Sequence, residues 1–228
     1  MIKVRAEVWP FLALGAALGG AVALAVRWGG TGWGRAAWIG AGAGAVVCAY
    51  MLYFFRDPDR LIPGNPAMIV AGADGRIAGI TRVREDRFLR EETVRISVFL
   101  SLFDVHVNRA PIAGTSTFLG YFPGRRFFTF REKSSTMNQH NAILLEGERT
   151  RCLVTQIVGP VCRRVAYFLD HDQGVRVRKG DRIGMMKFGS RLDMYFPKDD
   201  IEVVVKKGDV VRAGQTVVAR LRQREGRP

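Results

Sequence analysis

Two long apolar stretches open the chain. Residues 8–26 and 36–55 contain no charged side chain, and a glycine-rich loop, residues 27–35, separates them. Each stretch has roughly the 20 residues that a helix needs to cross the hydrocarbon core of a bilayer. Their many glycines and alanines suit close packing of two helices in lipid. The pattern predicts an N-terminal transmembrane helical hairpin over residues 1–55. A cleaved signal peptide would have one shorter apolar region, and a buried helical hairpin is the remaining alternative.

After residue 55 the pattern changes to short runs in which apolar and polar residues alternate. Residues 95–100, 152–158 and 201–205 predict β-strands, and pairs containing Gly, Pro or Asp separate the runs. Residues 157–169 form the one segment that suggests a helix. The sequence therefore predicts a mainly β domain of the α+β class over residues 56–228.

A weak internal repeat lies near the C-terminus. Residues 177–184 resemble residues 205–214 at an offset of 28 positions, and each copy has a Gly-Asp turn followed by a second glycine. Glycine supplies the positive φ that such tight turns need. Repeats of this kind are typical of the small barrels of biotinyl and lipoyl carriers, so we expect a barrel-sandwich-hybrid architecture, which says little about chemistry.

The chain is strongly basic, with a formal net charge of +14. This charge fits nucleic acid, acidic substrates or an anionic membrane surface, and the apolar hairpin favours the membrane over nucleic acid. Basic residues lie at both ends of the hairpin and in its loop, and the positive-inside rule mildly favours cytoplasmic ends. We therefore expect the inner cell membrane, with the domain that follows the hairpin on its cytoplasmic face. Cys48, Cys152 and Cys162 give no even disulfide set, which indicates structural thiols in a reducing compartment.

Three segments carry candidate chemistry. They are AGADGRI at residues 71–77, FLSLFDVHVNRAP at residues 99–111 and MKFGSRLD at residues 186–193. They contain Asp74, His106 and the dipeptide Gly189-Ser190. Each is ordinary when taken alone, because Asp-Gly and Gly-Ser are common turn pairs and a strand histidine is often structural. Their joint occurrence favours a functional site.

The third segment resembles the Gly-Ser processing site of the phosphatidylserine decarboxylase family, in its short, membrane-bound form. Three further pieces are similar to the same family: FFRDP at residues 54–58, the Asp74-Gly75 turn, and QIVG at residues 156–159 with the following Arg163-Arg164. The similarity runs in one consistent order from about residue 54 to residue 220.

This resemblance implies self-cleavage between Gly189 and Ser190. The Ser190 hydroxyl would attack the Gly189 carbonyl, giving a β chain, residues 1–189, and an α chain, residues 190–228. Ser190 would become a pyruvoyl group, the pyruvate cofactor. The two chains would form a heterodimer, with a higher oligomer left open. The pyruvoyl ketone would form a Schiff base with phosphatidylserine, and loss of CO₂ would give phosphatidylethanolamine without a metal ion.

The resemblance also assigns roles to individual residues. His106 is expected to move protons, and Asp74 to orient or support the base. Many family members have a second histidine where this chain has Arg109, so the base for self-cleavage is left open between His106 and Asp74 acting through another group. The guanidinium groups of Arg163 and Arg164 suit a lipid phosphate, although a solvated face explains them equally well.

Two other readings remain open. Lys187 in MKF resembles a biotin-acceptor lysine, so the chain could be a membrane-anchored biotinyl- or lipoyl-like adaptor or carrier without enzymatic activity. Within the enzyme class, the substrate could carry another serine-derived head group or an ether backbone. The aromatic and basic residues of segment 121–128 suit contact with lipid head groups. His140 and His171 lack metal-ligand spacing.

Overall fold

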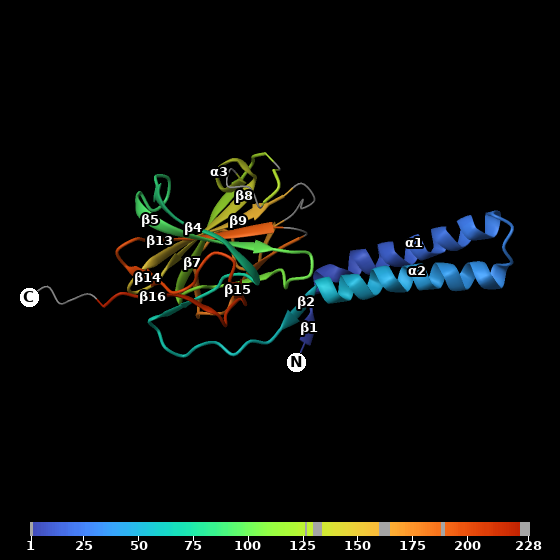
Figure 1. The fold of residues 1–228 in the computed structure, drawn as a ribbon, viewed down its shortest axis with the longest axis horizontal. Helices are drawn as coiled ribbons and strands as arrows, with labels where there is room; N and C mark the ends of the chain where they lie inside the picture. The colour runs from blue at the N-terminus through green and yellow to red at the C-terminus, as the bar shows by residue number, and fades with distance from the viewer. Residues whose placement is uncertain (1, 126, 130–133, 160–164, 188–189, 224–228) are drawn as a thin grey trace, which may run out of the picture. The chain divides into compact units, whose positions relative to one another are not determined.

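The computed structural model describes residues 2–125, 127–129, 134–159, 165–187 and 190–223. The chain divides into two compact units, Met1–Asp59 and Arg60–Pro228 (Figure 1). The first unit is mainly helical, and the second is built from strands. The expected mainly β domain preceded by an apolar helical hairpin is therefore confirmed.

The first unit is an antiparallel pair of helices. Its helices are α1 (Trp9–Trp28), preceded by the 3₁₀ turn η1 (Ala6–Val8), and α2 (Trp33–Phe54). A short ladder between β1 (Ile2–Val4) and β2 (Arg56–Pro58) joins the two ends of the unit. Both helices are long and apolar enough to cross a membrane.

Glycines determine how closely the two helices pack. Gly15 and Gly19 on α1, and Gly40 and Gly44 on α2, are buried in the hairpin. A Cβ atom at Gly19 would lie 2.7 Å from the Gly40 carbonyl oxygen, and one at Gly40 would collide with the Gly19 carbonyl oxygen. The four-residue spacing puts each pair on one face of its helix, which lets the backbones touch as in membrane-embedded helix pairs.

The second unit is built around an eight-stranded antiparallel sheet. Its strands, in spatial order, are β11 (Val175–Val177), β7 (Gly114–Phe122), β8 (His140–Glu146), β9 (Arg151–Val158), β13 (Ser190–Pro197), β5 (Glu91–Leu100), β4 (Gly75–Glu85) and β15 (Val210–Val211). Two three-stranded sheets complete the unit: β10 (Val165–Tyr167), β12 (Arg182–Met186) and β6 (Val107–Arg109); and β14 (Ile201–Val203), β16 (Val217–Leu221) and β3 (Met68–Val70). A short helix, α3 (Ser134–Met137), precedes β8.

One face of the large sheet packs on the main hydrophobic core. On β13 the alternate residues Leu192, Met194 and Phe196 belong to this core, together with residues of β5, β12 and β16. The intervening residues Arg191 and Asp193 are also buried, on the opposite face. β13 is therefore buried on both faces, although apolar and polar residues alternate along its first half.

The predicted strands are present, whereas the described part of segment 157–169, where a helix was expected, includes residues of two strands. Segment 157–169 begins inside β9 and ends beyond β10, and residues 160–164 lie outside the described residues. The two copies of the repeat form the same turn: Asp181 accepts a hydrogen bond from the Arg178 backbone, and Asp209 accepts one from the Lys206 backbone. The sequence therefore predicted these turns correctly, whereas the apolar run around residue 157 belongs to strand β9 and not to a helix.

Candidate functional site

Ser190 is the first residue of β13 and lies in the middle of the large sheet. It pairs with Val158 of β9 on one side and with Leu100 of β5 on the other. Its side chain is fully buried. The strand alternation puts it on the same face as Leu192, toward the main core. The Ser190 Oγ atom has no hydrogen-bond partner within the described part of the chain, which is unusual for a buried hydroxyl and marks it as a functional candidate.

Three of the expected site residues cannot be placed. Gly189, Arg163 and Arg164 lie outside the described residues. The cleavage position and the phosphate-binding role therefore stay predictions.

His106 is held by the loop that connects β5 to β6. The Asp104 carboxylate caps this loop by accepting hydrogen bonds of 2.7 Å from both the backbone NH and the hydroxyl of Ser101. The Asp104 carbonyl oxygen lies 2.9 Å from Nδ1 of the buried His106 ring. A carbonyl only accepts, so Nδ1 carries a proton and Nε2 is the basic nitrogen of the neutral ring.

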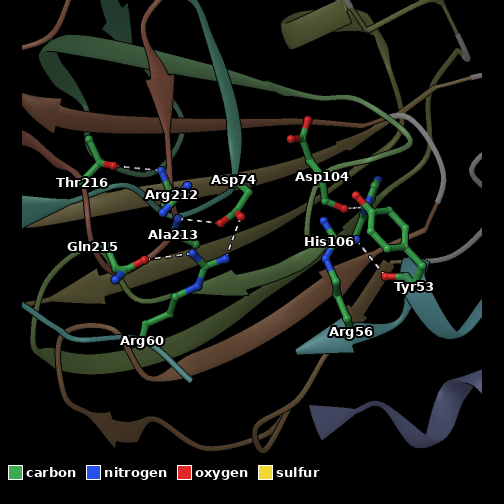
Figure 2. Close-up of polar contacts among 10 residues, drawn as sticks. All are labelled: Tyr53, Arg56, Arg60, Asp74, Asp104, His106, Arg212, Ala213, Gln215 and Thr216. Atoms are coloured by element: carbon green, nitrogen blue, oxygen red, sulfur yellow. Dashed lines mark hydrogen bonds and ion pairs between the residues drawn. The ribbon is translucent and has the colours of Figure 1, made fainter. Parts of the chain in front are cut away.

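Asp74 lies just before β4 and is held from two sides (Figure 2). Its Oδ2 atom accepts a 2.7 Å hydrogen bond from the Arg60 guanidinium, and its Oδ1 atom accepts one of 2.7 Å from the Ala213 backbone NH. Burial raises the pKa of Asp74, while the Arg60 charge opposes this rise and the nearby Asp104 charge adds to it.

The structure brings Asp74, His106 and Ser190 to one end of the large sheet. Ser190 pairs with Leu100, at the start of the loop that ends at His106. The Arg109 backbone NH, three residues after His106, donates to the Gly72 carbonyl at 2.9 Å, which joins this segment to that of Asp74. Among the described residues, however, the Asp74 carboxylate bonds to Arg60 and Ala213 and not to His106. Its support of the base stays a prediction.

Arg109 has a structural contact of its own. Its side chain is buried, and Nη1 donates to the Gly180 carbonyl oxygen at 2.9 Å. A guanidinium remains protonated at any working pH, so Arg109 cannot take the place of a second histidine as a proton acceptor.

Sequence reasoning missed a buried amide pair near Ser190. Gln156 Nε2 donates to Asn108 Oδ1 at 2.7 Å, and both side chains are fully buried. Gln156 pairs with Leu192, two residues beyond Ser190 on β13, and faces the same side of the sheet. Asn108 Nδ2 has no hydrogen-bond partner among the described residues. The buried donor next to β13 could not be inferred from the sequence, because Asn108 lies in an otherwise ordinary strand.

A second missed feature is a buried ionic network directly after Ser190. Arg191 Nε donates to Asp193 Oδ1 at 2.7 Å, and Arg191 Nη2 donates to Ser97 Oγ at 2.6 Å. The Ser135 hydroxyl donates to Asp193 Oδ2 at 2.7 Å. These contacts tie the start of β13 to β5 and to α3, so the backbone on the C-terminal side of the junction is firmly held.

The two remaining histidines have structural surroundings. Nδ1 of His140 lies 2.9 Å from the Asn138 carbonyl oxygen, and burial lowers the pKa of His140. The His171 ring packs edge-on against Phe118 and Tyr167. No group of three His, Cys, Asp or Glu side chains that could hold a metal ion occurs among the residues described.

Comparison with known proteins identifies the family. Residues 47–219 match the sequence profile of phosphatidylserine decarboxylase. The phosphatidylserine decarboxylase proenzyme of Symbiobacterium thermophilum is 36% identical over 224 residues, which is 96% of each chain. The proenzyme of Carboxydothermus hydrogenoformans is 39% identical over 173 residues, covering 76% of this chain and 80% of the relative, and that of Prosthecochloris aestuarii is 41% identical over 176 residues, covering 77% and 79%. The chain, with its buried serine at the head of β13, therefore belongs to the phosphatidylserine decarboxylase family.

Proposed function

We propose that this chain is a phosphatidylserine decarboxylase that makes its pyruvoyl cofactor from Ser190. The observation that carries the proposal is the Ser190 hydroxyl, which is fully buried and has no hydrogen-bond partner among the described residues. A buried hydroxyl without a partner is costly, and this one belongs to the serine that the family resemblance assigns to processing. The matched relatives are named proenzymes, which fits a chain that is processed after synthesis. Nothing in the comparisons supports the adaptor or carrier alternative.

Processing starts from the serine itself. Ser190 Oγ attacks the Gly189 carbonyl carbon, the new C–O bond replaces the Gly189–Ser190 C–N bond, and the freed amine takes the proton. Loss of the Cα proton and cleavage of the Cβ–O bond then release the Gly189 carboxylate and leave dehydroalanine at position 190. Tautomerisation and hydrolysis of this group give ammonia and the pyruvoyl ketone.

Two residues of the site suit the proton and charge requirements of this step. A serine hydroxyl is a weak nucleophile and needs a base. His106 offers Nε2, because the Asp104 carbonyl fixes the proton on Nδ1. The tetrahedral intermediate needs a donor for its oxyanion. We assign this role to Asn108 Nδ2, which Gln156 orients.

The same residues serve decarboxylation. When formed, the pyruvoyl group supplies a carbonyl that binds the substrate amine and accepts the electron pair left by CO₂. His106 would supply the proton that the former carboxyl-bearing carbon takes up on the way to phosphatidylethanolamine. Arg163 and Arg164 are proposed to bind the lipid phosphate. Asp74, with Arg60, sets the charge at this end of the sheet.

The fold explains how a cut chain stays in one piece. Residues 190–228 contribute β13, β14, β15 and β16, and β13 is hydrogen-bonded to β5 on one side and to β9 on the other. After cleavage the α chain therefore remains at the centre of a sheet formed mostly by the β chain. The apolar hairpin supports a location in the inner cell membrane, with the β domain on the cytoplasmic face.

Denaturing electrophoresis and mass spectrometry test the proposal. The wild-type chain should appear as fragments 1–189 and 190–228, the second beginning with a pyruvoyl group. Ser190→Ala should give one inactive chain of 25.4 kDa. Ser116→Ala, which removes another fully buried serine hydroxyl, is the matched control and should still be cut. Cleavage of Ser190→Ala into the same two fragments would contradict the proposed mechanism.

Two chemical tests extend this result. Sodium cyanoborohydride should attach the substrate amine covalently to fragment 190–228, and vesicles that contain phosphatidylserine should accumulate phosphatidylethanolamine. His106→Gln should abolish decarboxylation, and the same gel shows whether it also stops cleavage. An intact junction with an unmodified serine in the purified wild-type chain would refute the assignment of the cofactor.

A further inference from the structure

Exposed apolar side chains of the β domain gather at the end of the sheet that holds Ser190. Within the described residues 60–223, eight large apolar side chains are exposed. Six of them lie in segments at this end: Leu102 (44% exposed), Phe103 (66%), Tyr121 (53%), Phe128 (56%), Met137 (39%) and Val210 (62%). We call these six residues the apolar rim. Isolated apolar residues on a surface are normal, but their concentration at one end of a domain indicates a contact surface.

Strand register places the rim around the cleavage position. Leu102 and Phe103 follow Leu100, the β5 partner of Ser190. Tyr121 and Met137 flank the paired ends of β7 and β8, where Phe122 faces His140 and His140 faces Ile157 of β9. Val210 pairs with Arg76, which pairs with Phe99. The rim therefore lies at the ends of β5, β7, β8 and β15, and Ser190 begins β13, which lies between β8 and β5 in the sheet.

The rim residues lie on segments held by hydrogen bonds. The Asp104 carboxylate ties the Leu102–Phe103 turn to Ser101. On the other side, Asn138 bonds to the Phe127 backbone through both its Oδ1 and Nδ2 atoms and to the Val158 carbonyl oxygen at 2.9 Å. Because hydrogen bonds fix these loops with their apolar side chains facing outward, the folded domain itself keeps the rim side chains exposed.

Exposed cations accompany the rim. Arg125 lies between Tyr121 and Phe128, and Lys206 and Lys207 belong to the turn that precedes Val210. Arg76, the partner of Val210, donates to the Gly208 carbonyl oxygen of the same turn. The nearby carboxylates of Asp104 and Asp209 are each engaged in capping their own turns. Apolar tips with flanking cations are complementary to an anionic lipid surface, where the tips enter the head-group region and the cations meet the phosphates.

We propose that the apolar rim is a membrane-contact surface, which lies on an anionic bilayer and admits a phospholipid from the membrane to the site at Ser190. This inference rests on the proposed function only in assuming that the lipid is converted at Ser190. The membrane contact itself does not depend on that function. Ser190 is fully buried, so a lipid head group has to leave the bilayer at a place next to the site. The apolar hairpin keeps the chain at the membrane, while the rim orients the β domain toward its substrate.

A depth measurement tests the contact without any need for activity. The full chain with Ser190→Ala and with Cys48, Cys152 and Cys162 replaced by alanine is labelled with an environment-sensitive dye at Phe103→Cys. In vesicles of phosphatidylglycerol and phosphatidylcholine, nitroxide-bearing lipids should quench this dye at least about threefold more than a dye at Val204→Cys. Val204 is a matched control: it is 45% exposed, and its neighbour Val203 shares a cleft with Lys198 and Asp199, at the opposite end of β13. Equal quenching at the two positions would overturn the proposal.

A comparison of two substrates tests the functional consequence. The double variant Leu102→Asp/Phe103→Asp should turn over phosphatidylserine in vesicles about tenfold or more slowly than the wild type, because two carboxylates face an anionic surface. Its rate on monomeric dihexanoyl phosphatidylserine should stay within about twofold, since that substrate needs no bilayer. Val204→Asp should leave both rates unchanged. Equal losses on both substrates, or no loss on vesicles, refute the membrane contact, whereas a wild type inactive on both substrates refutes the proposed function.

Discussion

The pairing of Asp74 with Arg60 gives a quantitative prediction about the stability of the β domain. The two side chains are 11% and 9% exposed, and their closest N–O distance is 2.7 Å. Arg60 also donates to Gln215 Oε1 at 2.9 Å. Arg60→Met keeps most of the aliphatic stem but leaves a buried carboxylate with only the Ala213 NH as donor. Removing one partner of a buried pair costs about 3–5 kcal/mol.

Protonation limits this cost at low pH. From the ordinary pKa of 3.8, holding an aspartate protonated costs about 1.6 kcal/mol at pH 5 and about 5.7 kcal/mol at pH 8. At pH 8 the carboxylate therefore stays charged and the full penalty of about 3–5 kcal/mol applies. At pH 5 protonation limits the charge penalty to about 1.6 kcal/mol, and the lost Gln215 contact adds about 1 kcal/mol at both pH values.

The sign of this pH dependence follows from the direction of the shift. In Arg60→Met the folded-state pKa of Asp74 rises further above its unfolded value, because the Arg60 charge that lowered it is gone. The destabilisation is thus fully present above the folded-state pKa and is lost progressively as the pH falls from there toward the ordinary value of 3.8.

Urea unfolding in detergent micelles, followed by pulse proteolysis, measures the effect. All variants carry Ser190→Ala, so that each is a single uncut chain. The difference between wild type and Arg60→Met should be about 2 kcal/mol larger at pH 8 than at pH 5. Gln215→Ala should cost about 1 kcal/mol at both pH values, and adding Asp74→Asn to Arg60→Met should recover part of the loss. A penalty for Arg60→Met that is the same at both pH values would show that Asp74 is not the charge left behind.

Three further predictions follow from other buried groups. Asn108→Asp keeps the acceptor for Gln156 but removes the Nδ2 donor, so self-cleavage followed on a denaturing gel should slow about 10²–10³-fold. Asn108→Ser retains a donor and should slow cleavage less. Equal cleavage rates in the wild type and both variants would exclude the oxyanion role. Burial raises the pKa of Cys152 well above its ordinary value, so its thiol should resist iodoacetamide in the folded chain at pH 8 and react only in urea, as peptide mass spectrometry can show. The lowered pKa of His140 means that the folded state resists its protonation, so stability should fall as the pH drops below about 6.5; His140→Gln should remove that part of the loss, and an unchanged pH profile would contradict it.

Sequence patterns determined the elements whose cause is local. The two uncharged stretches predicted the helices because length and apolarity alone decide whether a segment suits a bilayer. The Gly-Asp turns could be predicted because their geometry depends on a glycine at positive φ and on a carboxylate that bonds to its own turn. The φ angles are 85° at Gly180 and 94° at Gly208. Gly189-Ser190 and His106 were predicted as site residues from their order along the chain and a family resemblance.

Tertiary structure decided the rest, because it depends on which strands become neighbours. β13 carries Arg191 and Asp193 on one face and Leu192 on the other, and only its position between β5 and β9 makes both faces interior. The same pairing gives Ser190 its buried, unpartnered hydroxyl and brings Asn108 close to it through Gln156. The structure shows Arg60 as a partner of Asp74, which the sequence did not predict. The packing around a buried carboxylate decides its hydrogen-bond partners, and no sequence periodicity indicates them.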